Sequence, residues 1–189
     1  MPMYWEGNII RLRAVEPSDA ETHFQVNKDT NTFQMLDKIF PPASKSGVEK
    51  WAAETSLKQF DDDEYSFQME TLVDGHLVGH ISTHDCDSRV GVFRYGINVL
   101  PGHQGKGCAS EAIKLVLRYY FDELRYQKCN VHIYAVNTVS IRLHERAGFI
   151  EEGRLRRVVF TDGRFSDLLI YGITVEEFRD RNVGSRSPG

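Results

Sequence analysis

The strongest pattern in this chain has the period of an amphipathic helix and runs from Ala109 to Leu124. Its apolar positions recur every three or four residues, at Ala109, Ala112, Ile113, Val116, Leu117, Tyr120, Phe121 and Leu124. This spacing places them on one helical face, while charged residues occupy the other side. The pattern therefore predicts a helix that packs one face against a flat surface.

Two Asp-Gly pairs, Asp74-Gly75 and Asp162-Gly163, each lie between stretches in which apolar and polar residues alternate. Such a pair between two alternating stretches is a strong signal for a β-hairpin. The strands that we expect cover residues 8–15, 65–73, 76–84, 89–100, 129–136, 149–160 and 165–174. Shorter helices are expected over residues 18–26, from Ser44 or Ser46 to Phe60, and over residues 137–146, with a last turn of helix at 176–181.

The order of these elements defines the fold class. It predicts an α+β protein with a mixed, mostly antiparallel sheet of roughly six to seven strands and about four helices. The strand at 129–136 should run parallel to the strand at 89–100, because the long helix crosses over between them. We expect one domain over residues 1–181 and a flexible tail over residues 182–189.

A glycine-containing turn comes directly before the long helix. Gly105 and Gly107 let the backbone bend and approach a ligand with no Cβ in the way. The free N–H groups at the start of the helix favour an anion such as phosphate. The turn matches neither common nucleotide motif, because Leu100 stands where a P-loop has its first glycine and Ser110 where the dinucleotide motif has its third.

The composition narrows the choice of partners. With 41% hydrophobic and 26% charged residues among 189, the chain has the composition of a globular protein, and its net charge of -4 disfavours nucleic acid. Its apolar runs are too short to span a membrane, and its first residues do not resemble a signal peptide. Cys86, Cys108 and Cys129 lack C-x-x-C spacing, which is typical of reduced thiols. We therefore expect a cytoplasmic protein with no membrane partner.

Two further patterns have ordinary explanations. His76, His80 and His84 are four residues apart, but on a strand each step of four spans roughly 13 Å, so we expect no metal site. The acidic run from Asp61 to Glu64 is interpreted as a solvated loop. The alternative is a patch that attracts a cationic amine.

Two sequence motifs resemble those of the GNAT N-acetyltransferase superfamily. The stretch from Gln104 to Ala109 is similar to the acyl-CoA signature Q/R-x-x-G-x-G/A, and the stretch from Asn137 to Phe149 resembles the family helix N-x-x-[AS]-x-x-[LF]-Y-x-x-x-G-F. The ending, with Glu152–Arg156, Asp162-Gly163 and Asp167, is similar to the RimJ/RimL-like branch. The resemblance covers roughly residues 8 to 178, nearly the whole chain, and it implies the GNAT fold.

The resemblance implies that a neutral amine attacks the acetyl thioester of acetyl-CoA directly in a ternary complex, without a metal. Main-chain amides of the glycine turn would hold the pyrophosphate, and three strand residues would bind the pantetheine arm. The residues implied to bind acetyl-CoA are Ile97, Asn98, Val99, Gln104, Gly105, Lys106, Gly107, Cys108, Ala109, Ser110, Asn137, Ser140 and His144. Lys106 could equally be a solvated loop residue, and Asn137 could also be a plain helix N-cap.

The chain departs from the family pattern at the groups that move protons. His144 stands where the family has a tyrosine acid, and its usual pKa of about 6.5 would suit that role. Tyr134 and Cys108 are the alternatives for the acid, and Cys108 is not expected to be a nucleophile. Arg94 stands where many RimJ/RimL-like relatives have a glutamate base, so either Glu64 or a chain of waters would take the proton.

We therefore expect an acetyl-CoA-dependent N-acetyltransferase with His144 as its catalytic residue. Its acceptor would be a primary amine: a protein N-terminus, a polyamine or another small amine. A second copy of the chain, in a homodimer, is an expected partner. The alternative is a non-catalytic acyl-CoA-binding module, because the usual tyrosine and glutamate are missing.

Overall fold

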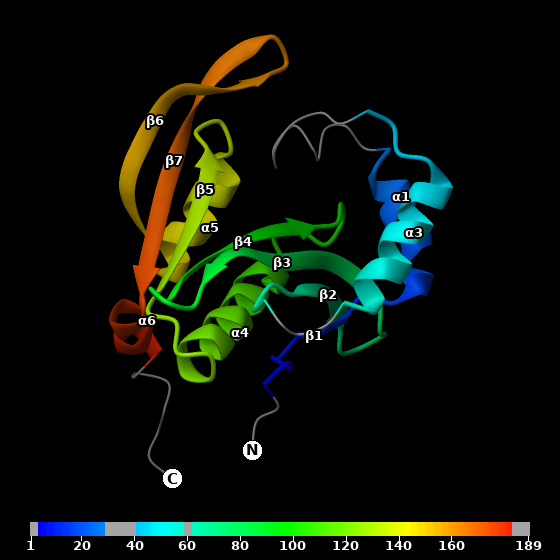
Figure 1. Ribbon diagram of the computed structural model, residues 1–189, viewed down its shortest axis with the longest axis horizontal. Helices are drawn as coiled ribbons and strands as arrows, with labels where there is room; N and C mark the ends of the chain where they lie inside the picture. The colour runs from blue at the N-terminus through cyan, green and yellow to red at the C-terminus, as the bar shows by residue number, and fades with distance from the viewer. Residues whose placement is uncertain (1–3, 29–40, 59–61, 183–189) are drawn as a thin grey trace.

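The computed structural model describes residues 4–28, 41–58 and 62–182, and its strands form one seven-stranded sheet in the order β1-β2-β3-β4-β5-β7-β6 (Figure 1). The strands are β1 (Ile10–Ala14), β2 (Ser66–Thr71), β3 (Leu77–Asp87), β4 (Val92–Val99), β5 (Lys128–Tyr134), β6 (Ile150–Thr161) and β7 (Arg164–Thr174). The helices are η1 (Pro17–Asp19, a 3-10 turn), α1 (Ala20–Val26), α3 (Lys45–Ser56), α4 (Cys108–Asp122), α5 (Thr138–Ala147) and α6 (Val175–Asn182). The predicted α+β class is thereby confirmed.

The sheet is antiparallel except where β4 meets β5. These two strands pair in parallel over three positions, Val92 with Lys128, Phe93 with Cys129 and Arg94 with Asn130. Beyond Arg94 both strands continue, β4 to Val99 and β5 to Tyr134, but they no longer pair. The sheet is therefore open between its fourth and fifth strands.

The long helix α4 covers one face of the sheet, as its apolar period predicts. Ile113, Val116 and Tyr120 on this helix are almost completely buried, and the Tyr120 ring stacks on Phe93 of β4 at 4.0 Å between centroids. Burying an aliphatic or aromatic side chain of this size contributes roughly 1.5–3 kcal/mol, so a helix with several of them is fixed firmly to the sheet. Leu115, which lies outside the predicted face, is also buried, and α4 contacts β1 and α5 in addition to the sheet strand β4.

Helices α1 and α3 cover the opposite face, over the β1 side of the sheet. Neighbouring residues of a strand point to opposite faces. The hydroxyl of Thr83 on β3 lies within hydrogen-bond distance of the Tyr120 hydroxyl on α4, at 2.6 Å, whereas His80 of the same strand contacts His23 of α1 at 5.8 Å between rings. Figure 1 shows α1 and α3 on one side and the long β6–β7 hairpin on the other, with the ends of β4 and β5 between them.

Both predicted Asp-Gly hairpins form. Asp162 and Gly163 have φ values of 50° and 71°, the left-handed conformation that a two-residue hairpin turn requires at both positions. At the earlier hairpin, Gly75 has φ 69°. Here β2 ends at Thr71 and β3 begins at Leu77, so the connection is five residues long and the predicted strand ends at 73 and 76 are wrong, whereas local turn chemistry placed the later hairpin.

Several boundaries differ from the prediction. The first helix is not capped by a Ser18–Glu21 box, because Asp19 accepts the N–H of Glu16 at 2.9 Å and a 3-10 turn precedes α1. Ser44 rather than Ser46 caps α3, since its Oγ accepts the N–H of Gly47 at 3.0 Å.

The two ends of the described chain also differ from the prediction. The predicted end of α3 at Phe60 lies outside the described residues, as does the tail from residue 183 onward. Asn182, expected to begin that tail, is the last residue of α6, which is eight residues long rather than a single turn. This helix brings the described α-helices to five, one more than expected.

Candidate active site

The candidate site lies at the opening between β4 and β5, where two cavities meet. One cavity, of about 680 Å³, lies between the glycine turn, the start of α4, and α5. The other, of about 320 Å³, is lined by residues of α1, β2, β3, β4, β5 and α5. Four residues line both cavities: Ile97, Asn98, Asn137 and Ser140. Because of this shared lining, we treat the two cavities as one site. We call the first the large cavity and the second the small cavity.

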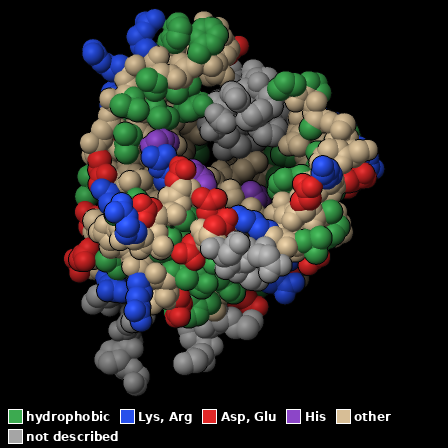
Figure 2. Space-filling view, in the orientation of Figure 1, with side chains coloured by type: hydrophobic (Ala, Val, Ile, Leu, Met, Phe, Trp, Pro, Cys, Tyr) green, Lys and Arg blue, Asp and Glu red, His purple; other side chains and the backbone are tan. Residues whose placement is uncertain are grey.

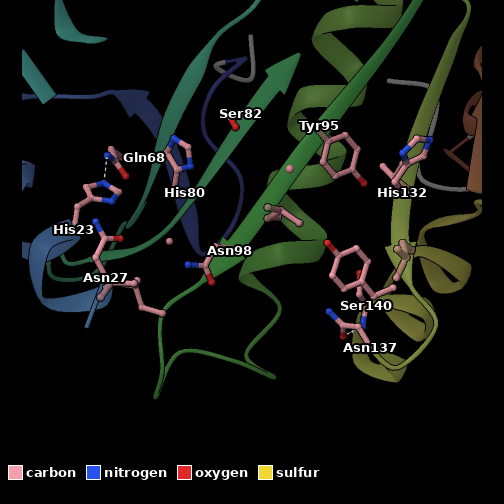
Figure 3. Close-up of a pocket in the computed structure, with 18 of the residues that line it drawn as sticks. His23, Asn27, Gln68, His80, Ser82, Tyr95, Asn98, His132, Asn137 and Ser140 are labelled. Atoms are coloured by element: carbon pink, nitrogen blue, oxygen red, sulfur yellow. Dashed lines mark hydrogen bonds between the residues drawn. The ribbon is translucent and has the colours of Figure 1, made fainter. Parts of the chain in front are cut away.

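The small cavity is visible as part of a hollow on the molecular surface. Figure 2 shows this hollow between the β6–β7 hairpin and the α1–α3 pair, with histidine side chains around it. In Figure 3, His23, Gln68 and His80 lie together at one end of the pocket and Tyr95, His132, Asn137 and Ser140 at the other. The small cavity is therefore a channel. One end lies at the opening between β4 and β5, and the other end, which we call distal, lies at His23, Gln68 and His80.

The glycine turn has the backbone conformation that the sequence predicted. Gly105 and Gly107 have φ values of 73° and 89°, where a side chain would be strained. Gly107 is the N-cap of α4 and no side chain caps it within the described chain. The Gln104 side-chain amide donates to the carbonyl of Val99 at 3.3 Å and so ties the turn to the end of β4. The first turn of α4 thus faces the large cavity as an uncapped helix N-terminus, which favours an anion.

The structure brings most of the predicted acetyl-CoA residues together. Those that line the large cavity are Ile97, Asn98, Val99, Gln104, Gly105, Gly107, Cys108, Ala109, Ser110, Asn137 and Ser140. His144 lines the small cavity instead. Lys106 is exposed and lines neither of the two, which agrees with the alternative that it is a solvated loop residue.

Asn137 begins α5 as an N-cap. Its Oδ1 accepts the N–H of Ser140 at 3.0 Å, and Gly148 with φ 106° ends the helix. An N-cap of this type typically stabilises a helix by about 1 kcal/mol. Because Asn137 and Ser140 also line both cavities, the cap fixes the position of two residues beside the strand opening.

His144 of α5 is buried beside Tyr95 of β4. Its side chain is 2% exposed, its ring stacks on Tyr95 at 5.8 Å, and its Nδ1–H donates to the carbonyl of Ser140 at 2.8 Å. In the neutral ring the proton is then on Nδ1, so Nε2 carries a lone pair, and Nε2 has no hydrogen-bond partner among the described residues. Burial lowers the pKa of His144 below its usual value. This environment disfavours the protonated form that a general acid needs.

The other predicted proton carriers are placed differently. Tyr134 is half-buried at the end of β5 and lines the small cavity close to the opening. Cys108 is buried at the start of α4, and burial raises the pKa of its thiol. Arg94 pairs with Asp85 at 3.1 Å. Glu64 lines neither cavity.

The acidic run is largely engaged by its own neighbours. Asp62 pairs with Lys58 at 2.9 Å, and Asp63 accepts hydrogen bonds from Tyr120 through its carbonyl and from Tyr126 through its carboxylate. Asp61 lies outside the described residues. These contacts fit a structural loop better than an open patch for a cation.

Sequence reasoning missed the polar residues of the small cavity. They are Thr22, His23, Asn27, Gln68, Ser82, Tyr95 and His132, together with His80, which was considered only as a metal ligand. The alternation of β3 could have revealed that His80 and Ser82 share a face. No group of three or more His, Cys, Asp or Glu side chains that could hold a metal occurs in residues 4–28, 41–58 and 62–182. Within the same ranges no helix is long and apolar enough to cross a membrane.

Glu111 is a further residue that the motifs did not single out. Its carboxylate accepts the backbone N–H groups of Asn8, Ile9 and Ile10 at 2.6, 2.9 and 2.9 Å. These three bonds tie the first turn of α4 to the start of β1. They also engage both oxygens of the carboxylate with main-chain donors.

Comparison with known proteins identifies the family. The family model described as acetyltransferase (GNAT) domain matches residues 10–150. The chain is 39% identical over 175 residues to the SPbeta prophage-derived uncharacterized N-acetyltransferase YokL of Bacillus subtilis, covering 93% of this chain and 95% of that protein. It is 26% identical over 171 residues to the putative ribosomal N-acetyltransferase YdaF of the same organism, covering 89% and 93%.

Among solved structures, the chain is similar to the spermidine N-acetyltransferase from Vibrio cholerae in complex with CoA and spermine. The TM-score is 0.79 at 26% sequence identity, over 90% of this chain and 98% of that one. The chain therefore belongs to the GNAT acetyltransferase family. It is an acetyl-CoA-dependent N-acetyltransferase, and the GNAT fold that the motifs implied is confirmed.

Proposed function

We propose that this enzyme transfers the acetyl group of acetyl-CoA to a primary amine by direct attack in a ternary complex. The observation that carries the proposal is the meeting of two cavities at the opening between β4 and β5. Acetyl-CoA would enter from the large cavity and the amine from the small one. The reacting atoms would then meet beside Ile97, Asn98, Asn137 and Ser140.

Acetyl-CoA is held, in this proposal, by main-chain groups. The amides from Gln104 to Ser110 bind the pyrophosphate at the uncapped start of α4. The backbone of Ile97–Val99 binds the pantetheine arm along the edge of β4 that β5 has left unpaired. A backbone N–H on this edge donates to the thioester oxygen and stabilises the oxyanion that forms there.

The reaction needs two proton movements. The amine nitrogen forms a bond to the acetyl carbon and loses a proton, while the carbon–sulfur bond breaks and the thiolate gains one. We propose that Tyr134 donates the proton to the thiolate, because a phenol carries its proton at neutral pH whereas burial lowers the pKa of His144 and so disfavours its protonated form. His144 would then act as a hydrogen-bond acceptor beside the opening. The proton from the amine leaves through water, since Glu64 lies outside the cavities.

The proposal also concerns the identity of the acceptor amine. The Vibrio cholerae relative is a spermidine N-acetyltransferase, and YdaF carries the name of a ribosomal N-acetyltransferase. Polyamines and protein N-termini are therefore the first acceptors to test. The relation to YdaF also supports the RimJ/RimL-like branch. The cytoplasmic location and the homodimer stay predictions from the sequence.

Thiol release from acetyl-CoA over a panel of amines tests the proposal, with CoA binding measured in parallel by calorimetry. The panel should include spermidine, peptides with free N-termini and simple alkyl amines. We expect CoA to bind and at least one amine to be acetylated at its nitrogen, as seen by mass spectrometry. CoA binding with no turnover over the whole panel would support the non-catalytic module instead.

A further inference from the structure

Three side chains from three elements close the distal end of the small cavity. Gln68 of β2 lies directly opposite His80 of β3 in the antiparallel pair, and α1 places His23 beside both. The Gln68 side-chain amide donates to Nε2 of His23 at 2.7 Å. Trp51 of α3 packs edge-on against His23 at 4.7 Å, behind this group (Figure 3 shows the first three). We call His23, Gln68 and His80 the distal subsite.

The distal subsite holds two polar atoms that are buried but unpaired. Gln68 is completely buried, yet its Oε1 has no hydrogen-bond partner within the described part of the chain. The same holds for Nε2 of His80. Buried polar atoms without a partner are costly and uncommon, so a ligand that pairs with both of them would be bound selectively.

The chemistry of these atoms fits a hydroxyl or a primary amide. Gln68 Oε1 is an acceptor, and a neutral histidine nitrogen can be a donor or an acceptor according to its tautomer. A hydroxyl and a carboxamide can each donate to one atom and accept from the other. An ammonium group can only donate, and it brings a charge that must be compensated when water is removed.

The described residues of the distal subsite provide no charge that could compensate an ammonium group. Burial lowers the pKa of His23, and it lowers that of His80 to about 4. None of the described residues that line the small cavity is Asp, Glu, Lys or Arg. Two carboxylates on neighbouring elements, Asp19 and Glu70, are already paired with Arg13. An ammonium group in the distal subsite would therefore contact polar side chains, but no unpaired carboxylate among the described residues that line the cavity.

We propose that the distal subsite binds an uncharged hydroxyl or carboxamide group on the far end of the acceptor amine. The preferred acceptors are thus amino alcohols, amino sugars or amino amides rather than diamines. This inference rests on the proposed function, because it concerns the acceptor of that same reaction. It gives the acceptor two ends: an amine at the strand opening and a neutral polar group between Gln68 and His80.

The test uses three series of small amines that differ only in the distal group. At each chain length from two to six methylenes, the ω-amino alcohol is compared with the diamine and with the alkyl amine that ends in methyl. We expect kcat/KM for the best amino alcohol to exceed that for the diamine and alkyl amine of equal length by about tenfold, as expected for one or two net hydrogen bonds. Equal values, or a preference for the diamine, would overturn the proposal.

Variants of Gln68 test the assignment to this end of the cavity. Gln68→Leu removes the acceptor and should abolish the preference for the alcohol over the alkyl amine. Gln68→Glu places a carboxylate at the same position and should raise kcat/KM for the diamine relative to the alcohol. His76→Asn is the matched control, because His76 is exposed at the turn before β3, outside both cavities. Retention of the alcohol preference in a folded Gln68→Leu protein would overturn the proposal.

A binding experiment separates this inference from the proposed function. The same three series are titrated by calorimetry into the protein saturated with CoA, so that the readout does not need turnover. Tighter binding of the alcohols supports the distal subsite even if no amine is acetylated, in which case only the reaction is wrong. Acetylation of all three series with equal efficiency would leave the reaction intact and reject the subsite.

Discussion

Arg94 of β4 and Asn130 of β5 are the last pair in register before these two strands separate. The first residues of β4 that no longer pair with β5 are Tyr95 and Gly96, which line the small cavity, and the separation continues past Ile97, which lines both cavities. The position at which pairing stops therefore decides where a ligand can pass through the sheet. The residues after it supply main-chain groups that the neighbouring strand does not use.

The conformation of Gly107 leads to the first prediction. Its φ of 89° is strained for any other residue, and an added Cβ would meet Ile9 Cδ1 at 3.3 Å. We expect Gly107→Val to weaken CoA binding at least about tenfold in calorimetry, because the turn that presents the amides is distorted. Gly163→Val is the matched control, since Gly163 has φ 71° in the distant β6–β7 turn. Equal losses in both variants would contradict the loop assignment.

The environment of His144 leads to the second prediction. Tyr134→Phe should lower kcat by a factor of about 100, within the range for the loss of a general acid, whereas His144→Gln should lower it less than about tenfold. CoA affinity should change little in either variant. Single-turnover measurements at saturating amine would show which residue acts on the chemical step. A larger effect at His144 would return the acid role to the histidine.

The pH profile gives a third, independent prediction about the same residue. Burial lowers the pKa of His144 below 6.5, so the protonated fraction is already falling below that pH. If His144 were the acid, kcat at saturating amine would decline as the pH rises toward neutrality. We expect kcat instead to hold constant or rise between pH 6.5 and pH 8, as more of the amine loses its proton. A decline over that window, lost in His144→Gln, would refute the assignment to Tyr134.

Buried His80 predicts how stability depends on pH. Its pKa is about 4 in the folded protein and about 6.5 when exposed, so the unfolded chain binds more protons between these values. Its stabilising contribution is therefore complete above pH 6.5 and is lost as the pH falls toward 4. By linkage, the free energy of unfolding should drop by about 2 kcal/mol between pH 6.5 and pH 5 from this residue. Urea unfolding should show a shallower drop in His80→Phe and an unchanged drop in the exposed control His76→Asn.

Glu111 leads to a prediction about both stability and binding. Glu111→Ala would leave the N–H groups of Asn8, Ile9 and Ile10 without their carboxylate. We expect a loss of about 2–3 kcal/mol in urea unfolding, and weaker CoA binding because the start of α4 is no longer tied to β1. Lys114→Ala, an exposed substitution on the same helix, should change both quantities by much less. Unaltered CoA affinity in the Glu111 variant would show that the tie is only structural.

The parts of the fold that could be predicted depend on local chemistry. The apolar period from Ala109 to Leu124 and the two Asp-Gly turns specify their elements without reference to distant residues. The glycine turn is equally local, because positive φ at Gly105 and Gly107 is a property of that segment alone. Most of the residues predicted to bind acetyl-CoA therefore line the large cavity, and their role in binding stays a prediction.

The small cavity depends on the assembled fold. His23, Gln68 and His80 are separated in sequence, and only the β2–β3 register and the docking of α1 bring them together. The burial of His144 is equally non-local, since it results from the rings of Tyr95 and Phe149 that pack on it. A motif specifies where such a residue stands in the chain but not the polarity of its surroundings, and the polarity decides its protonation state.

The short parallel contact between β4 and β5 has a mechanical consequence. Four strands on one side and three on the other form two sections that are joined, within the sheet, by the pairs from Val92–Lys128 to Arg94–Asn130. A molecule threaded through the opening would touch both sections and act as a cross-brace between them. Binding of a ligand in the opening would then make the whole sheet more rigid. The rigidity of the protein should therefore report whether the opening between β4 and β5 is occupied.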